Sequence, residues 1–163
     1  MDRVTFEDFQ AAVTAALAKA GLATPLAAES GWAAAWLQAA GYKALAMVLE
    51  ALNAGPAPAA GSPALIVSLG LVDGEGVSCV FLAPRLAALA DGHGRIVLTN
   101  ARDGLFVLPF TVRGDYGIGC PVDPSFAIGG ERVKNPYAEK VTLGMAEGVE
   151  VDRGQWTELL GRG

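Results

Sequence analysis

Apolar residues recur at the three- and four-residue spacing of an α-helix throughout the first third of the chain. Thr5 suits the N-cap of the first such run, and Gly21 suits the position just beyond its last turn. A second run begins at Thr24 before a proline, which is favoured in a first helical turn, and a third run covers residues 42–52. We therefore predict three alanine-rich helices within residues 1–53.

The second of these helices is apolar over more than one stripe. It is rich in alanine, and Trp32 and Trp36 stand four residues apart, which places them on one face. A helix with so broad an apolar surface must be buried on several sides, either against a sheet or against a second copy of the chain. The two tryptophans then belong to the core or to a dimer interface. The alternative is that they form one wall of a ligand pocket.

The pattern changes after residues 54–63, whose prolines and glycines are typical of a surface connection. Short runs of apolar and β-branched residues follow, separated by turns that contain glycine. These runs predict two hairpins, one joining residues 65–72 to 77–82 and the other joining 95–101 to 105–112.

Two more short strands, residues 141–145 and 149–151, are predicted near the end of the sequence. Asp152 suits the N-cap of a last helix, which Trp156 would anchor to the body of the protein. Together the elements predict an α+β fold, in which N-terminal alanine-rich helices pack on a mainly antiparallel sheet and a short C-terminal helix completes the structure.

The length of 163 residues favours one domain with a normal hydrophobic core. We expect a single domain over residues 1–163, with a helical part at 1–53, a linker at 54–63 and a strand-rich part at 64–163. The helical part alone would make a marginal core, so it must pack on the sheet, on a second chain, or on both.

Composition excludes several classes of function. Hydrophobic residues make up 52% and charged residues 18%, which argues against disorder. The net charge is −5 and the 12 basic residues are scattered, so a nucleic-acid groove is not expected. Acidic residues near the start replace the basic and apolar parts of a signal peptide, and no run is long and apolar enough for a membrane helix. We therefore expect a cytoplasmic protein that binds neither nucleic acid nor membrane.

Short motifs in the helical part carry a resemblance to a known family. Residues 28–31 read Ala-Glu-Ser-Gly, and residues 33–37 read Ala-Ala-Ala-Trp-Leu, both within the alanine-rich stretch 26–45. Residues 105–110 form an apolar segment that contains Leu-Pro-Phe. In these features the chain resembles an uncharacterised bacterial domain-of-unknown-function family. The resemblance implies no activity, because it brings no catalytic residues with it.

Cys120 is the most reactive candidate for chemistry. It follows Gly117 and Gly119, and glycines let backbone N–H groups converge as an oxyanion hole requires. A nucleophilic cysteine also needs a base, and His93 is the only histidine in the chain. The alternatives are a small buried thiol for Cys120 and an exposed turn residue for His93. Two cysteines outside a Cys-x-x-Cys pair and one histidine do not make a zinc site, so we expect neither a metal nor a cofactor.

Residues 113–136 are rich in glycine and proline, and a segment of this length without regular structure tends to be functional or disordered. Arg113 and Arg132 would hold a small anionic ligand there, with Asp115 beside them. The glycines of this segment do not match a dinucleotide or nucleoside-triphosphate loop.

Two functional interpretations remain open. The leading one is a non-catalytic binding or interaction protein that forms a homodimer through its alanine- and tryptophan-bearing helices. The competing one is a small enzyme, or an accessory subunit of a metabolic enzyme, that binds an anionic small molecule at residues 113–136 with Cys120 as the reactive group.

Overall fold

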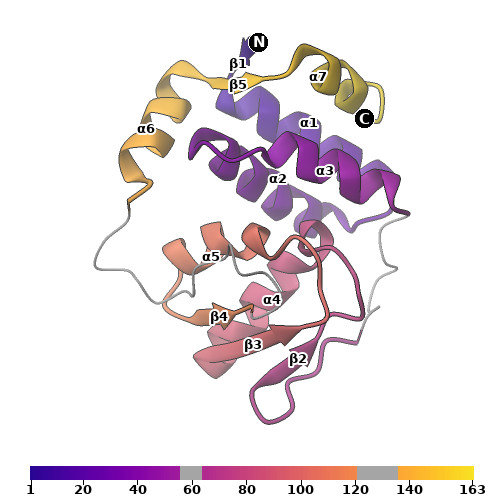
Figure 1. The fold of residues 1–163 in the computed structure, drawn as a ribbon, viewed down its shortest axis with the longest axis vertical. Coiled ribbons are helices and arrows are strands. Elements are labelled where there is room, and N and C mark those ends of the chain that lie inside the picture. Colours follow the sequence, from indigo (N-terminus) through magenta and orange to yellow (C-terminus); the bar gives the residue numbers. More distant parts are fainter. Residues whose placement is uncertain (56–63, 121–135) are drawn as a thin grey trace. The chain divides into compact units, whose positions relative to one another are not determined.

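A computed structural model describes residues 1–55, 64–120 and 136–163 of the chain (Figure 1). These residues belong to two compact units. The first unit contains residues 1–55 and 136–163, and the second contains residues 64–120. Helices occur with one antiparallel and one parallel sheet, so the predicted α+β class is confirmed.

The first unit is mainly helical and is built from both ends of the described chain. Its elements are β1 (Asp2–Val4), α1 (Phe6–Lys19), α2 (Thr24–Ala39), α3 (Ala44–Asn53), α6 (Ala138–Glu147), β5 (Val149–Val151) and α7 (Arg153–Leu160). Strand β1, which the sequence pattern did not indicate, pairs antiparallel with β5 and sets Arg3 opposite Glu150. This pairing ties the first residues of the unit to its last segment.

Helix α2 lies at the centre of the first unit, where α1, α3, α6 and β5 all pack against it. Its residues from Ala33 to Leu37 are buried on every side. The broad apolar surface predicted for this helix is therefore covered by several elements of its own chain. Trp36 is buried and packs edge-on against the ring of Tyr137, with 5.3 Å between the ring centroids. Trp32 is half-buried.

Capping residues account for the helix ends that the sequence predicted correctly. Thr5 Oγ1 accepts a hydrogen bond from Asp8 N at 3.0 Å at the start of α1, and the Asp152 carboxylate accepts one from Gln155 N at 2.9 Å at the start of α7. Helix α7 is anchored as expected, because Trp156 stacks on the buried ring of Phe9 with 5.9 Å between ring centroids.

The strand predicted at residues 141–145 is wrong, because these residues lie within α6. Val141 and Gly144 are its buried positions, and three-residue spacing suits one face of a helix. A β-carbon on Gly144 would lie 2.6 Å from the Ala39 side chain, so α6 approaches α2 closely at this point.

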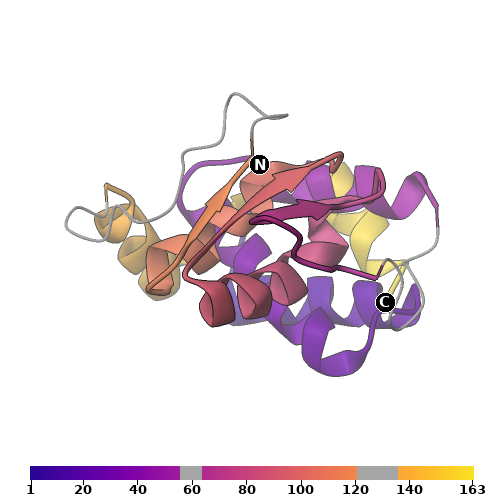
Figure 2. The same ribbon diagram turned by 90° about the horizontal axis from the view of Figure 1, so that it is seen from below.

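The second unit alternates strands and helices. Its elements are β2 (Leu71–Asp73), α4 (Cys79–His93), β3 (Arg95–Thr99), a 3-10 turn at Gly104–Val107, α5 (Leu108–Arg113) and β4 (Gly117–Gly119). The three strands form a parallel sheet in the order β2-β3-β4. Figure 2 shows α4 and α5 on one side of this sheet, and α4 packs on β3 and β4.

Both predicted hairpins are wrong. Residues 77–82 enter α4 instead of a strand, because Ser78 caps the helix and accepts a hydrogen bond from Val80 N at 3.1 Å. Residues 79–87 are apolar with one arginine, and such a run suits a buried helix as well as a buried strand. Residues 105–112 form the 3-10 turn and α5, where Pro109 lies in the first helical turn rather than on a strand edge.

Most of the predicted linker 54–63 lies outside the described residues, as do residues 121–135 of the predicted binding segment. The expectation of one domain over 1–163 stays a prediction. Among the helices in the described ranges, none has both the length and the hydropathy needed to span a bilayer.

Candidate functional site

Cys120 lies at the carboxyl end of the strands of the parallel sheet in the second unit, and His93 lies at their amino end. Cys120 directly follows β4, and His93 ends α4 just before β3. Because β3 and β4 run parallel with Arg95 opposite Gly117, Cys120 lies about 10 Å beyond the level of Arg95 along the strand direction, and His93 precedes Arg95 at the other end of the strand. The structure therefore does not bring the predicted nucleophile and base together.

The surroundings of the two side chains also differ. Cys120 is buried, and it forms no disulfide with Cys79. His93 is exposed, and its Nδ1 lies 2.8 Å from the carbonyl oxygen of Leu89. A carbonyl only accepts, so Nδ1 carries the proton in this arrangement.

The predicted anion-binding residues lie at the other end of β4. Arg113 ends α5, and its guanidinium lies 5.3 Å from the ring centroid of Phe110. Asp115 is exposed and comes two residues before β4. Arg132 lies outside the described residues. The structure thus groups Arg113 and Asp115 with His93 near the amino edge of the sheet, away from Cys120.

The carboxyl edge of a parallel sheet is the usual place for a ligand, so its loops bear on function. Ser78 Oγ donates to the Asp103 carboxylate at 2.5 Å, and Cys79 N donates to the Arg102 carbonyl at 2.7 Å. With Val80 N bound to Ser78 Oγ, the first amides of α4 already have partners within the fold. No open amides remain in this turn to cradle a phosphate, and Ser78 is wholly buried beyond the reach of a substrate.

Asp73, the last residue of β2, connects the turn after β2 to the turn after β3 at the same end of the sheet. Its Oδ1 accepts from Glu75 N at 2.8 Å and from Asn100 Nδ2 at 3.1 Å. Glu75 and Asn100 both have φ near +50°, a conformation that residues with a β-carbon rarely adopt. The acidic and amide groups of this edge therefore stabilise turns. Within the described ranges, no cluster of three His, Cys, Asp or Glu side chains is close enough to hold a metal ion.

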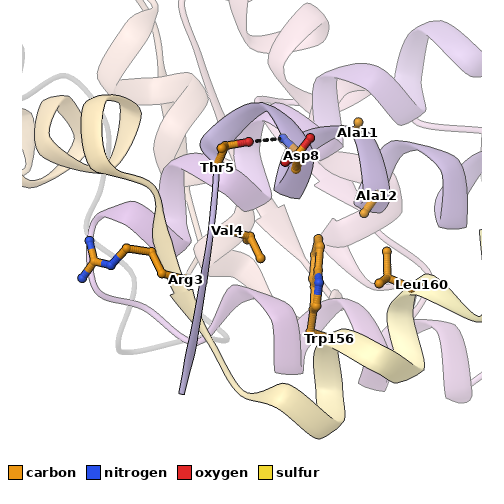
Figure 3. Close-up of a pocket in the computed structure, with 8 residues that line it drawn as sticks. All are labelled: Arg3, Val4, Thr5, Asp8, Ala11, Ala12, Trp156 and Leu160. Carbon is orange, nitrogen blue, oxygen red and sulfur yellow. Dashed lines mark hydrogen bonds between the residues drawn. The ribbon is translucent and has the colours of Figure 1, made fainter.

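The first unit offers a more accessible hollow of about 530 Å³ between α1 and α7. Figure 3 shows Trp156 and Leu160 projecting from α7 toward α1, while Arg3 points away from them. Its walls combine apolar and polar groups: Val4, Ala11, Ala12, Trp156 and Leu160, with Arg3, Thr5 and Asp8. Leu160 lies at the rim of this hollow and is 54% exposed.

Helix α1 carries no charge between Phe9 and Ala18. Its outward residues there include Ala11, Ala12, Ala15 and Ala18, which are exposed or half-buried and which we call the alanine ridge, and the polar residues Gln10 and Thr14 are half-buried beside them. The outward face of a surface helix is normally charged or polar. On its other side the ridge borders a second hollow of about 600 Å³, where α2 contributes Thr24 and Ala28.

Sequence reasoning missed this surface because it looked for reactive groups. The signal was present in the sequence, because residues 9–18 are ten consecutive uncharged residues in a helix that has one buried stripe. Alanine favours a helix whether it faces the core or solvent, so composition alone did not show that six of these ten residues are exposed or half-buried.

Comparison of the chain with protein-family models, with curated proteins and with solved structures finds no significant match. The resemblance of residues 26–45 and 105–110 to a bacterial family stays a prediction.

Proposed function

We propose that this protein acts by binding and that it pairs with a second copy of itself through the alanine ridge of α1. The observation that carries the proposal is the absence of charge on an exposed helical face that lies between two hollows, one of them rimmed by Leu160. Small side chains let two helices approach closely, and an apolar patch of this kind marks an interaction surface.

A second copy fits this surface because the charges at the ends of α1 are complementary. Glu7 lies in the first turn and Lys19 in the last turn. In an antiparallel, two-fold arrangement of two α1 helices, Glu7 of each copy approaches Lys19 of the other. A two-fold interface uses the same patch on both copies and must be self-complementary in this way.

Sedimentation equilibrium over a range of protein concentrations tests the proposal. We expect a monomer–dimer equilibrium that Ala11→Arg shifts to monomer, because Ala11 lines both hollows. Ala146→Arg is the matched control, since Ala146 is an exposed alanine in the last turn of α6, where a cation is tolerated. A strictly monomeric protein at high micromolar concentration, or equal effects of the two variants, would sink the proposal.

The charge pairing gives a second, independent test. Glu7→Lys places like charges opposite each other and should weaken the dimer. The double variant Glu7→Lys, Lys19→Glu reverses both charges and should restore it. Failure of the double variant to recover association would contradict the antiparallel arrangement even if the protein dimerises.

A further inference from the structure

The first unit has another groove, of about 470 Å³, between the turn that joins α2 to α3 and helix α6. Three cations and one carboxylate line it, namely Arg3, Lys43, Lys140 and Glu150. The chain as a whole has a net charge of −5, so this local excess of positive charge runs against its overall balance. We call this feature the lysine groove.

The cations of the groove differ in their partners. Arg3 Nη2 lies 3.1 Å from Glu150 Oε1 across the β1–β5 pair, so its guanidinium is already engaged. Lys43 and Lys140 are exposed, and neither makes a hydrogen bond or ion pair with any residue in the described part of the chain. Lys140 Nζ lies 3.7 Å from the β-carbon position of Gly41, which places this ammonium over the turn that carries Lys43.

Both lysines stand where a helix disfavours a cation. Lys43 is the N-cap of α3, and Lys140 lies in the first turn of α6. The amino end of a helix carries a partial positive charge, so each lysine adds to a potential that is already positive. The first turn of α3 contains no acidic residue to offset the charge of Lys43, whereas the first turn of α6 contains Glu139 beside Lys140.

Tyr42, which also lines the groove, does not reduce this charge. Its hydroxyl donates a hydrogen bond to the Tyr137 hydroxyl at 3.0 Å. Burial first, and then this hydrogen bond, raise the pKa of Tyr42 to about 12. The phenol therefore stays neutral at physiological pH and supplies no counter-charge to the lysines.

We propose that the lysine groove binds a small phosphate-type dianion, inorganic phosphate or a soluble phosphate monoester, between Lys43 and Lys140. A dianion matches two ammonium groups, and lysine contacts phosphate as a point charge. A carboxylate is best held by a free arginine fork, and the one arginine of the groove is bound to Glu150. The site is independent of the alanine ridge, because neither lysine lines the hollows beside it.

Isothermal titration of the full chain with inorganic phosphate tests this site, with sodium chloride at equal ionic strength as the reference. We expect saturable binding. Lys43→Gln and Lys140→Gln should each raise the Kd about tenfold, as expected for the loss of one charged hydrogen-bond donor. Arg95→Gln is the matched control, since it removes one positive charge from an exposed position in the second unit and should leave the Kd unchanged.

Amide chemical shifts provide a second readout that does not depend on the variants. Phosphate should move the signals of Gly41, Tyr42 and Lys43 and leave those of the sheet in the second unit in place. Absence of saturable binding would overturn the proposal. An equal loss of affinity in Arg95→Gln would also overturn it, because it would reduce the effect to overall charge.

Discussion

The hydroxyl of Thr14 occupies the space that a β-carbon on Gly31 would need. The same β-carbon would lie 2.8 Å from the carbonyl oxygen of Gln10, one turn earlier on α1. Thr14 Oγ1 also donates to that carbonyl at 2.8 Å. The contact between α1 and α2 therefore depends on a glycine at position 31, where their backbones approach closely.

Gly31→Ala should destabilise the protein in spite of the better helix propensity of alanine. The propensity gain is about 1 kcal/mol, whereas overpacking against a backbone carbonyl costs about 1 to 3 kcal/mol. Urea unfolding followed by tryptophan fluorescence measures the difference, because Trp32, Trp36 and Trp156 all belong to the first unit. Adding Thr14→Ala should recover part of the loss. A more stable Gly31→Ala variant would contradict the close approach.

Ser30→Ala, at the position before Gly31, should stabilise the protein. Ser30 is wholly buried, and its hydroxyl meets no hydrogen-bond partner among the residues that the structure describes. A buried hydroxyl without a partner loses its hydrogen bonds to water and gains none in the fold. Its removal should therefore stabilise the protein by about 1 kcal/mol. Urea unfolding would compare the stability of Ser30→Ala with that of Gly31→Ala. A loss of stability in Ser30→Ala would mean that the hydroxyl has a partner.

Tyr42 should titrate well above an ordinary tyrosine. Its pKa is raised to about 12, mainly by burial and then by Tyr137, so the unfolded chain releases the phenolic proton first. The resulting stability is fully present below pH 10 and is lost as the pH rises toward 12. Carbon-13 tyrosine spectra would follow the titration. Tyr137→Phe should lower the pKa of Tyr42 part of the way, and an unchanged value would contradict the role of the hydroxyl pair.

Cys120 should react slowly with a small alkylating agent in the native state, because it is 5% exposed. His93→Gln should leave this rate unchanged, since the two residues lie at opposite edges of the sheet. Cys79→Ala would restrict the reaction to one thiol. A marked slowing of Cys120 labelling in the His93 variant would show that the histidine does activate it and would revive the catalytic interpretation.

The amino ends of α1 and α7 were predictable because they depend on neighbouring residues. Thr5 and Asp152 are caps whose partners lie three residues away, and a local pattern contains all of that information. The parallel sheet was not predictable in the same way. Whether residues 79–87 form a strand or a helix depends on the crossover from β2 to β3, which no short window of sequence records.

The candidate sites also depend on contacts that a local sequence pattern does not contain. Cys120 and His93 were chosen for their chemistry, and only the register of β3 and β4 shows that they are apart. Lys43 and Lys140 were overlooked because each is a single charge in its own segment. Folding α6 against the end of α2 makes them neighbours, and sequence spacing gives no sign of it.

The pairing of Arg3 with Glu150 has a consequence for synthesis of the protein on the ribosome. The helices of residues 1–55 emerge early, but the strand and helices that complete their unit follow only after the second unit has been made. Until then, the apolar surface of α2 that α6 and β5 will cover is exposed in the nascent chain. The protein should therefore be most vulnerable to aggregation and to chaperone capture during translation, and this period should end when residues 138–151 leave the exit tunnel.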